Sequence, residues 1–385
     1  MIEVVWPGVH AARAPEVTFW VQCYAHERYV AESVRSALAQ THRSLEVIVS
    51  DDCSPDATFD VAARAVHDYR GPHRVTLLRS EHNRGSFAHI DEVIPHVRGA
   101  LVVWQSSDDV ADPRRAEQLA AAASRRGASG AWSNHRLIDD AGRDEGLGLA
   151  EDAPYRLALE DYAAGRFLDF TYGGTLCVSR RVFDVFGALP QSLPSSGIEH
   201  VLGFRAALLG RFVYLAEPLV RRRRHAGSLT EGFSSRDRAG DPLECQTRRI
   251  LRRLDVLTVI RAHLERKHRG LRVRRAKRLS ASLLEQIGHE VRRLAELRSF
   301  LARRARVGDP SSRELRHAAL VHEPPALVLL GAAAPGLNRI AFEGMYHAVP
   351  QALGPVEPCG LRNHRYPGVL SAWSEVELDR LIAAG

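Results

Sequence analysis

Short apolar runs alternate with amphipathic stretches through the first hundred residues of the chain. The runs at residues 17–23, 45–50, 75–79 and 99–104 have the length of buried strands, and each ends in polar residues. Between them, residues 29–39, 58–69 and 87–97 place apolar side chains at helical spacing. This alternation predicts an α/β domain with a mostly parallel, Rossmann-like sheet flanked by helices.

The pattern becomes less regular after residue 104. We expect helices at residues 114–125, 182–186 and 197–209, strands at 130–133, 171–179 and 212–215, and an acidic, glycine-containing loop at 139–152. These elements complete a catalytic domain that we assign to residues 1–240.

Beyond residue 240 the apolar spacing is helical, which predicts a mainly helical appendage. Ile250, Leu254 and Leu257 begin one apolar face, and Leu279, Leu283 and Ile287 begin a second. We assign residues 241–306 to a basic amphipathic region. Residues 307–385 are rich in proline and glycine and form an extension in which we recognise no chemistry.

The positive charge of the chain is concentrated in this appendage. The net charge is +7, and residues 247–306 contain 19 Lys and Arg against 5 Asp and Glu. Such a run is either a solvated helical face, a homodimer contact, or a surface for an anionic partner such as lipid head groups or a phosphorylated acceptor. We do not expect nucleic-acid binding, because Phe300 is the sole aromatic residue in this run.

Cysteine usage and hydropathy suggest a cellular setting. The five cysteines lie far apart in sequence and form no C-x-x-C pair, so we expect neither a disulfide framework nor a zinc ribbon. We find no signal segment, and no apolar run approaches the roughly 20 residues that span a bilayer. We therefore expect a cytoplasmic protein, with the 247–306 helices as the part that would touch a membrane surface.

Two pairs of carboxylates follow predicted strands. Asp51 and Asp52 come directly after the second strand, and Asp108 and Asp109 come after the fourth. The carboxyl ends of strands in open α/β sheets surround a ligand crevice, and paired carboxylates there suit Mg²⁺ or Mn²⁺ with a diphosphate. The structural alternative is a helix cap, which we favour for Ser54 and Asp56.

The order of these motifs resembles glycosyltransferase family 2. Tyr24 after the first strand, Gln40-Thr41, the Asp51-Asp52-x-Ser-x-Asp-x-Thr run, Asn83-Arg84-Gly85 and the doubled aspartate occur in the family's order and rough spacing over residues 17–230. The resemblance implies a GT-A fold and an inverting transferase that uses a nucleoside-diphosphate sugar and a divalent cation, Mn²⁺ or Mg²⁺.

The resemblance also implies roles for individual residues around the donor. Gln22 and Tyr24 would line the base pocket, Asp52 would accept a hydrogen bond from the base, and Asp51 would support that loop. Arg84 would lie near the diphosphate, although a surface arginine is the plain alternative. Asp108 and Asp109 would divide ribose contact and metal ligation, with Asp109 as the metal ligand. Ser106 and Ala25 depart from the aspartate and asparagine that many members have there.

The catalytic base and a second phosphate-binding segment are implied further along the chain. Glu199, six residues before Arg205, falls at the position of the family's general base, whereas Ile198 replaces an acidic residue. His200 is the alternative base, but we expect it to be a supporting or acceptor contact. The run from Arg221 to Arg224 and His225 resembles the family's Arg-x-His-x-x-Ser segment. His225 would bind the metal or the diphosphate, and Arg222 or Arg224 would neutralise phosphate.

The sequence leaves two other functions open. The Ser106 and Ile198 departures are compatible with a protein that binds sugar nucleotides or acts as a scaffold without catalysis. A nucleotidyltransferase is less favoured, because the first strand is not followed by a glycine-rich loop with Arg and Lys. The acceptor, whether a glycan, a lipid-linked sugar, a peptide or a small molecule, is not readable from the sequence.

Overall fold

The computed structural model describes residues 1–6, 14–124, 128–148, 156–157, 159, 173–189 and 198–227, with a few helical positions between 260 and 289. The chain divides into two units, Met1–Gly232 with Arg266–Gly270, and Phe233–Glu265 with Leu271–Gly385. The predicted 307–385 extension and most of the predicted basic helices lie outside the described residues. Ile260, Leu279 and Leu283, which the spacing assigns to apolar helix faces, are helical and buried.

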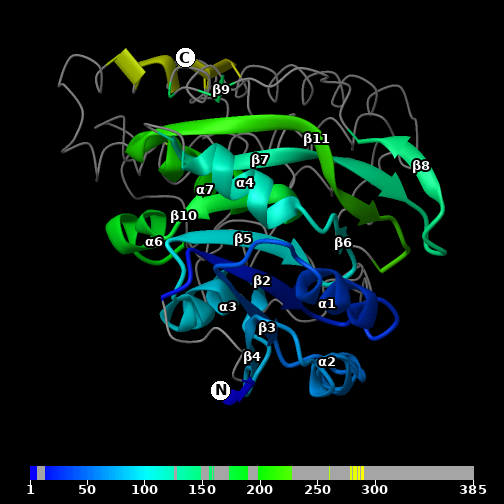
Figure 1. The fold of residues 1–385 in the computed structure, drawn as a ribbon. Coiled ribbons are helices and arrows are strands. Elements are labelled where there is room, and N and C mark those ends of the chain that lie inside the picture. The colour runs from blue at the N-terminus through cyan, green and yellow to red at the C-terminus, as the bar shows by residue number, and fades with distance from the viewer. Residues whose placement is uncertain are drawn as a thin grey trace, which may run out of the picture. The chain divides into compact units, whose positions relative to one another are not determined.

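A mixed sheet organises the first unit (Figure 1). Its strands in the described part of the chain are β1 (Ile2–Trp6), β2 (Val17–Cys23), β3 (Leu45–Asp51), β4 (Arg74–Arg79), β5 (Leu101–Ser106), β6 (Val110–Ala111), β7 (Ala128–Ile138), β8 (Asp144–Leu147), β9 (Arg156–Leu157), β10 (Leu176–Ser179) and β11 (Arg211–Arg223). The helices are α1 (Val30–Leu38), α2 (Thr58–His67), α3 (Gly85–Val93), α4 (Arg115–Ala123), α6 (Arg181–Phe186) and α7 (Ile198–Leu209), with 3-10 turns at Ile94–His96 and Gly173–Thr175.

The strand order places the ends of several strands at one edge of the sheet. The order is β1-β4-β3-β2-β5-β10-β7-β11-β6, with β8 paired to β7 and β9 to β11. Strands β4, β3, β2 and β5 are parallel, β10 is antiparallel to both β5 and β7, and β11 is parallel to β7. The carboxyl ends of β2, β3, β5 and β11 therefore lie at the same edge. The order reverses beside β2, and such a switch point is where open α/β sheets bind ligands.

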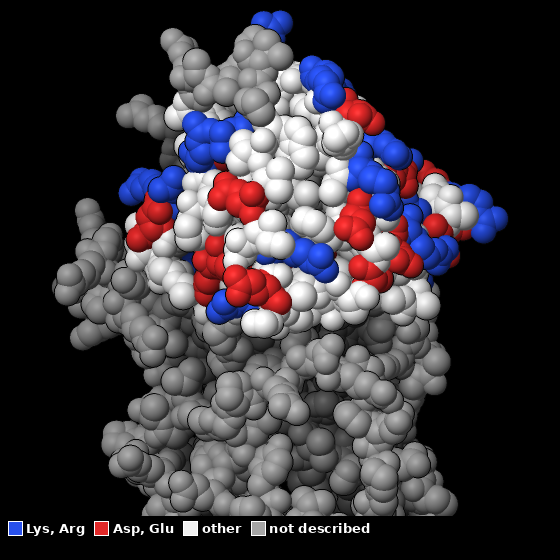
Figure 2. All heavy atoms as spheres, turned by 90° about the horizontal axis from the view of Figure 1, so that it is seen from below, with Lys and Arg blue, Asp and Glu red and all other residues white. Residues whose placement is uncertain are grey.

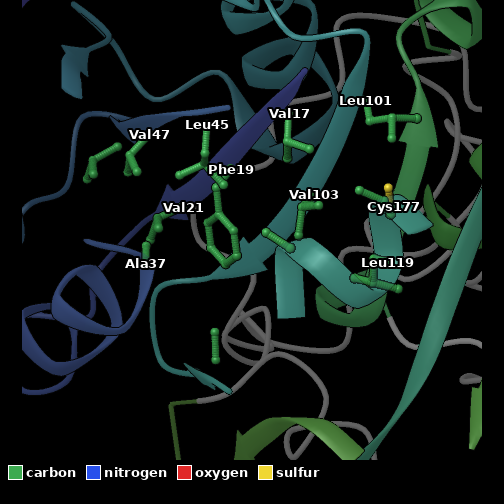
Figure 3. Close-up of a cluster of buried hydrophobic side chains, with 14 of the residues drawn as sticks. Val17, Phe19, Val21, Ala37, Leu45, Val47, Leu101, Val103, Leu119 and Cys177 are labelled. Carbon is green, nitrogen blue, oxygen red and sulfur yellow. The ribbon is translucent and has the colours of Figure 1, made fainter. Parts of the chain in front are cut away.

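Helices cover both faces of the parallel strands. Val17, Phe19 and Val21 of β2 share one buried cluster with apolar residues of α1, α2 and α4 (Figure 3). Because side chains alternate along a strand, Trp20 points to the opposite face. There it stacks on Trp104 at 5.5 Å between ring centroids and lies near His89 of α3. Burial on both faces explains the nearly continuous apolar runs of these strands.

The structure confirms the predicted elements up to residue 123 and corrects several beyond. The strand expected at 130–133 runs from Ala128 to Ile138, and the expected loop at 139–152 contains β8, which pairs with β7. The strand expected at 171–179 begins at Leu176, after the 3-10 turn. Strand β1, which the sequence did not predict, pairs antiparallel with β4.

The largest error concerns the arginine run, which we expected after the last strand. Strand β11 continues to Arg223, and Arg221–Arg223 pair in parallel with Arg136–Ile138 of β7. The carboxylate of Glu32 lies beside this strand and pairs with both Arg223 and Arg221, which offsets their positive charge. Apolar periodicity ends at Val220, so it could not predict this extension.

Candidate functional site

The loops that follow β2, β3, β5 and β11 carry most of the predicted site residues. Gln22 lies at the end of β2, where its Nε2 donates a hydrogen bond to the Ser86 carbonyl oxygen at 3.4 Å, and Tyr24 is half-buried just beyond. The topology brings these residues to the same sheet edge as Asp52, Asp108 and His225, as the sequence-based reasoning expects.

Asp51 and Asp52 are both buried, and each has its own set of donors. Asp51 accepts hydrogen bonds from the backbone nitrogen of Ser54 at 2.9 Å and from its hydroxyl group, and it pairs with Arg79 at 3.5 Å. The Asp52 carboxylate accepts the backbone N–H groups of Arg84 and Gly85, both at 2.9 Å. Burial raises the pKa of Asp52 to about 6, although these two donors oppose the rise.

The two Asp52 contacts explain how doubled aspartates can be buried here. Arg84 and Gly85 begin α3, whose first N–H groups have no partner within the helix. Asp52 supplies that partner from another loop and so fixes the start of α3 against the end of β3. Hydrogen bonding to the base, which the resemblance implies for Asp52, would have to use the remaining acceptor capacity of its oxygens.

A cluster of potential metal ligands lies at the switch point. His26, Asp108 and His225 each offer one ligand atom, and these atoms lie within 4.8 Å of one another. His225 Nε2 is 3.1 Å from Asp108 Oδ2, and His26 Nε2 is 3.9 Å from the same oxygen. The second ring nitrogen of His26, Nδ1, is 2.8 Å from the Ser107 hydroxyl group. Strands β2, β5 and β11 thus each contribute one residue from the segment that follows them.

The surroundings of Asp108 fit a bound divalent cation. Burial by itself raises the pKa of this carboxyl, but His26 and His225 together hold it below its ordinary value. Its other oxygen, Oδ1, is buried and has no hydrogen-bond partner among the described residues. A buried carboxylate oxygen without a donor beside two imidazoles is a set of ligands that accepts Mn²⁺ and similar ions.

Asp109, which the resemblance implied as the metal ligand, faces a different partner. Its Oδ1 accepts the backbone N–H of Arg223 at 3.0 Å, and the residue is fully buried. The carboxylate that lies beside His225 is that of Asp108. The geometry therefore favours Asp108 over Asp109 as the ligand, and it gives Asp109 a contact with the end of β11.

The other predicted phosphate contacts occupy more exposed positions. Arg84 is exposed and Arg222 is half-buried. Arg224 pairs with Glu145 of β8 at 3.0 Å. On the face around α2 and β4, seen from below in Figure 2, positive and negative side chains are interspersed and form no field of a single sign among the residues it colours.

Glu199 lies in the first turn of α7, which packs against β7, β10 and β11. Its side chain is 10% exposed, and its Oε1 is 3.7 Å from Nε2 of the buried His200. A Cβ added to Gly173 would lie 3.7 Å from Glu199 Oε2, so the Gly173–Thr175 turn approaches this carboxylate closely. His200 is thus a neighbour of Glu199 in space as well as in sequence, and its role stays a prediction.

Sequence reasoning missed three residues of the site, His26, Tyr29 and Arg223. The Tyr29 ring lies 4.5 Å from the His225 ring and 5.1 Å from the Arg223 guanidinium. His26 follows the strand that borders β5, so a correct strand order would have pointed to it. Arg223 is hidden in a run of four arginines, and its burial is visible only in the fold.

Comparison with known proteins finds a matching family model and several relatives. The family model described as glycosyl transferase family 2 matches residues 18–186, which include both aspartate pairs. This stretch, which is less than half of the chain, matches glycosyltransferase family 2. The succinoglycan biosynthesis protein ExoO of Rhizobium meliloti (strain 1021) is 34% identical over 131 residues, which are 34% of this chain and 36% of ExoO.

Solved structures show the same fold at low sequence identity. TarS 1–349 of S. aureus, crystallised with UDP-GlcNAc, is 17% identical with a TM-score of 0.51, over 70% of this chain and 71% of TarS 1–349. The mannosyltransferase PcManGT of Pyrobaculum calidifontis, in complex with GDP-Man and Mn²⁺, is 16% identical with a TM-score of 0.50, over 85% of this chain and 83% of PcManGT. These likenesses confirm the predicted GT-A fold.

The expectations about cysteines and membrane-spanning segments can be compared with the described residues only. Cys23, Cys53 and Cys177 are free thiols, as expected, while the other two cysteines lie outside the described residues. In the described part of the chain, no helix combines the length and apolar character that crossing a bilayer requires.

Proposed function

We propose that this chain is an inverting, divalent-metal-dependent glycosyltransferase that moves a sugar from a nucleoside-diphosphate sugar to an acceptor hydroxyl group. The observation that carries the proposal is the cluster of His26, Asp108 and His225 at the switch point of a family 2 domain. It lies at the sheet edge where a nucleotide would bind. The nucleotide sugars in TarS and PcManGT support the donor class, and Mn²⁺ in PcManGT supports the metal.

We assign the donor to the loops after β2 and β3. Gln22 and Tyr24 would contact the base, with Tyr24 stacking on it, and Asp52 would accept a hydrogen bond from it. Asp51 has the supporting position, because its oxygens already hold the Ser54 turn. Arg84 is exposed beside this loop and is free to turn towards a diphosphate.

We assign the cation to Asp108, His225 and His26. A divalent ion bound there would offset the negative charge that develops on the departing diphosphate. Asp108 Oδ1 supplies an unoccupied lone pair, and the Ser107 hydroxyl group at His26 Nδ1 orients that ring. Asp109 holds the end of β11 in place through the backbone of Arg223.

We assign the general base to Glu199. In a single displacement, the acceptor oxygen bonds to the anomeric carbon, the bond from that carbon to the diphosphate oxygen breaks, and the acceptor proton passes to the Glu199 carboxylate. One displacement inverts the configuration at the anomeric carbon. A side chain at Gly173 would contact this carboxylate, because a Cβ there would lie 3.7 Å from Glu199 Oε2.

The test is a transfer and donor-hydrolysis assay with UDP-, GDP- and dTDP-sugars, with Mn²⁺ and with EDTA. We expect turnover of at least one donor, its loss with EDTA, and a fall in kcat of about 10²- to 10⁴-fold in Glu199→Gln with little change in donor KM. Wild-type kcat in Glu199→Gln would refute the base assignment. Nucleotide-sugar binding without turnover of any donor would instead favour the scaffold function, and diphosphate release from a nucleoside triphosphate would favour a nucleotidyltransferase.

A further inference from the structure

Arg223 is buried at the end of a strand whose other arginines are exposed or half-buried. It is 4% exposed, whereas Arg221 is exposed and Arg222 is half-buried. Removing a guanidinium group from water is costly unless its donors are satisfied. The contacts that satisfy Arg223 therefore indicate what its position achieves.

The Arg223 side chain donates to three separate segments of the domain. Its Nε donates to the Asp108 carbonyl oxygen at 3.1 Å, and one NH₂ group donates to the carbonyl oxygens of Asp139 and Asp140 at 3.3 and 3.1 Å. The other NH₂ group donates to Glu32 Oε2 at 2.6 Å. The loop after β5, the turn between β7 and β8, and helix α1 are thereby joined through one side chain.

These segments are the ones that carry or support the proposed metal ligands. Asp108 is held through its own carbonyl oxygen, and His225 follows Arg223 by two residues on the same strand end. The centroid of the Tyr29 ring lies 5.1 Å from the Arg223 guanidinium, 4.5 Å from the His225 ring and 6.3 Å from the His26 ring. Tyr29 is fixed in turn by its hydroxyl hydrogen bond to Asp140.

We propose that Arg223 is a positioning residue that holds Asp108, His225 and, through Tyr29, His26 at the spacing a divalent ion requires. The proposal rests on the metal site proposed above. The sequence suggested a phosphate contact for Arg222 or Arg224 of the same run, whereas the positioning role belongs to Arg223. Groups that orient metal ligands from outside the ligand shell typically change metal affinity by about 10- to 100-fold when removed.

Two neighbouring arginines provide matched controls. Arg224→Met removes one positive charge from the same run, and the Arg224 side chain donates to Glu145 of β8 at 3.0 Å. Arg205→Met removes another buried guanidinium group, which donates to the carbonyl oxygens of Gly187 and Ala188 at 2.8 Å. The first control isolates the effect of charge, and the second isolates the general cost of losing a buried arginine.

The experiment measures Mn²⁺ affinity of the full chain from the electron paramagnetic resonance signal of free Mn²⁺, at a temperature where circular dichroism shows every variant folded. We expect Arg223→Met to weaken Mn²⁺ binding by about 10- to 100-fold, whereas Arg224→Met and Arg205→Met stay within about twofold of the unaltered chain. Arg223→Lys keeps the charge but can donate to fewer of the acceptors, so we expect a loss of Mn²⁺ affinity between that of Arg223→Met and that of the controls.

Affinity of Arg223→Met equal to that of the unaltered chain would overturn the proposal, as would equal losses in Arg223→Met and Arg205→Met. If Arg223→Met does not fold, Arg223→Lys decides: a loss of at least about threefold supports the proposal, and unchanged affinity overturns it. Failure of the unaltered chain to bind Mn²⁺, with or without UDP or GDP, would instead refute the metal site itself and this inference with it.

Discussion

His89 offers a direct test of how burial controls protonation beneath the donor loop. Its side chain is fully buried, Nε2 lies 2.8 Å from the Ser50 hydroxyl group, and Nδ1 lies 3.0 Å from the Ser80 hydroxyl group. Because Ser80 donates its proton to Glu92, it can only accept from Nδ1–H, and Ser50 then donates to Nε2. The neutral ring is thus hydrogen-bonded at both of its nitrogens.

The expected magnitude follows from the pKa of this ring. Burial lowers the pKa of His89 from 6.5 to about 4, although Glu92 opposes the fall. As the pH falls below 6.5, His89 is protonated in the unfolded chain before it is protonated in the folded chain. Protonation therefore stabilises the unfolded chain, and the free energy of unfolding decreases as the pH falls from 6.5 to about 4. At 1.36 kcal/mol per pKa unit, the loss between pH 7.5 and pH 5 is about 2 kcal/mol.

The perturbation is His89→Gln, whose amide keeps one donor and one acceptor for the two serines. Asp52, 3.6 Å away, has its pKa raised by burial to about 6, so its own contribution changes with pH in the opposite direction. Comparing the two proteins at each pH removes that contribution to first order. Urea unfolding at pH 7.5 and pH 5 should show the difference in unfolding free energy shifting by about 2 kcal/mol in favour of His89→Gln. A difference that stays constant with pH would refute the reasoning.

Other predictions follow from the fold. Cys53 has a φ of 55°, a conformation that costs other residues more than glycine, so Cys53→Gly should raise the unfolding free energy by about 1 kcal/mol in urea titrations, and a decrease would contradict this. Arg115 is fully buried and donates to the carbonyl oxygens of Trp104 and Gly174, so Arg115→Met should lower the unfolding free energy by about 3 kcal/mol; a loss below about 1 kcal/mol would show that these contacts are dispensable. Gly99→Ala would place a Cβ 2.4 Å from the backbone nitrogen of Thr18, so its melting temperature should fall by several degrees, and an unchanged one would show that the backbone yields freely.

The predictable part of the fold is the part in which burial and periodicity agree. Strands β2 to β5 are covered on both faces, so their apolar runs stand out from the amphipathic helices between them. Strand β11 could be predicted only as far as its apolar residues. Its continuation through Arg221 to Arg223 depends on pairing with β7 and on Glu32, which lies far away in the sequence.

The site was predictable to the same degree. The carboxylates at strand ends could be located because parallel strands bring their carboxyl ends together. The sequence could not predict which aspartate of the second pair faces the histidines. That depends on the turn after β5 and on the hydrogen bond from the Arg223 backbone to Asp109. His26 escaped notice because its approach to Asp108 requires β2 and β5 to be neighbours.

The central claim is tested most directly by Mn²⁺ binding to Asp108→Asn and Asp109→Asn, measured by electron paramagnetic resonance in the presence of UDP or GDP. We expect Asp108→Asn to lower the Mn²⁺ affinity by more than the roughly 100-fold that follows from losing a group that only orients a ligand. The reason is that this substitution removes the carboxylate beside His225 itself. Asp109→Asn, whose amide oxygen can still accept the Arg223 N–H, should bind Mn²⁺ more tightly than Asp108→Asn. Full Mn²⁺ affinity in Asp108→Asn would contradict the account.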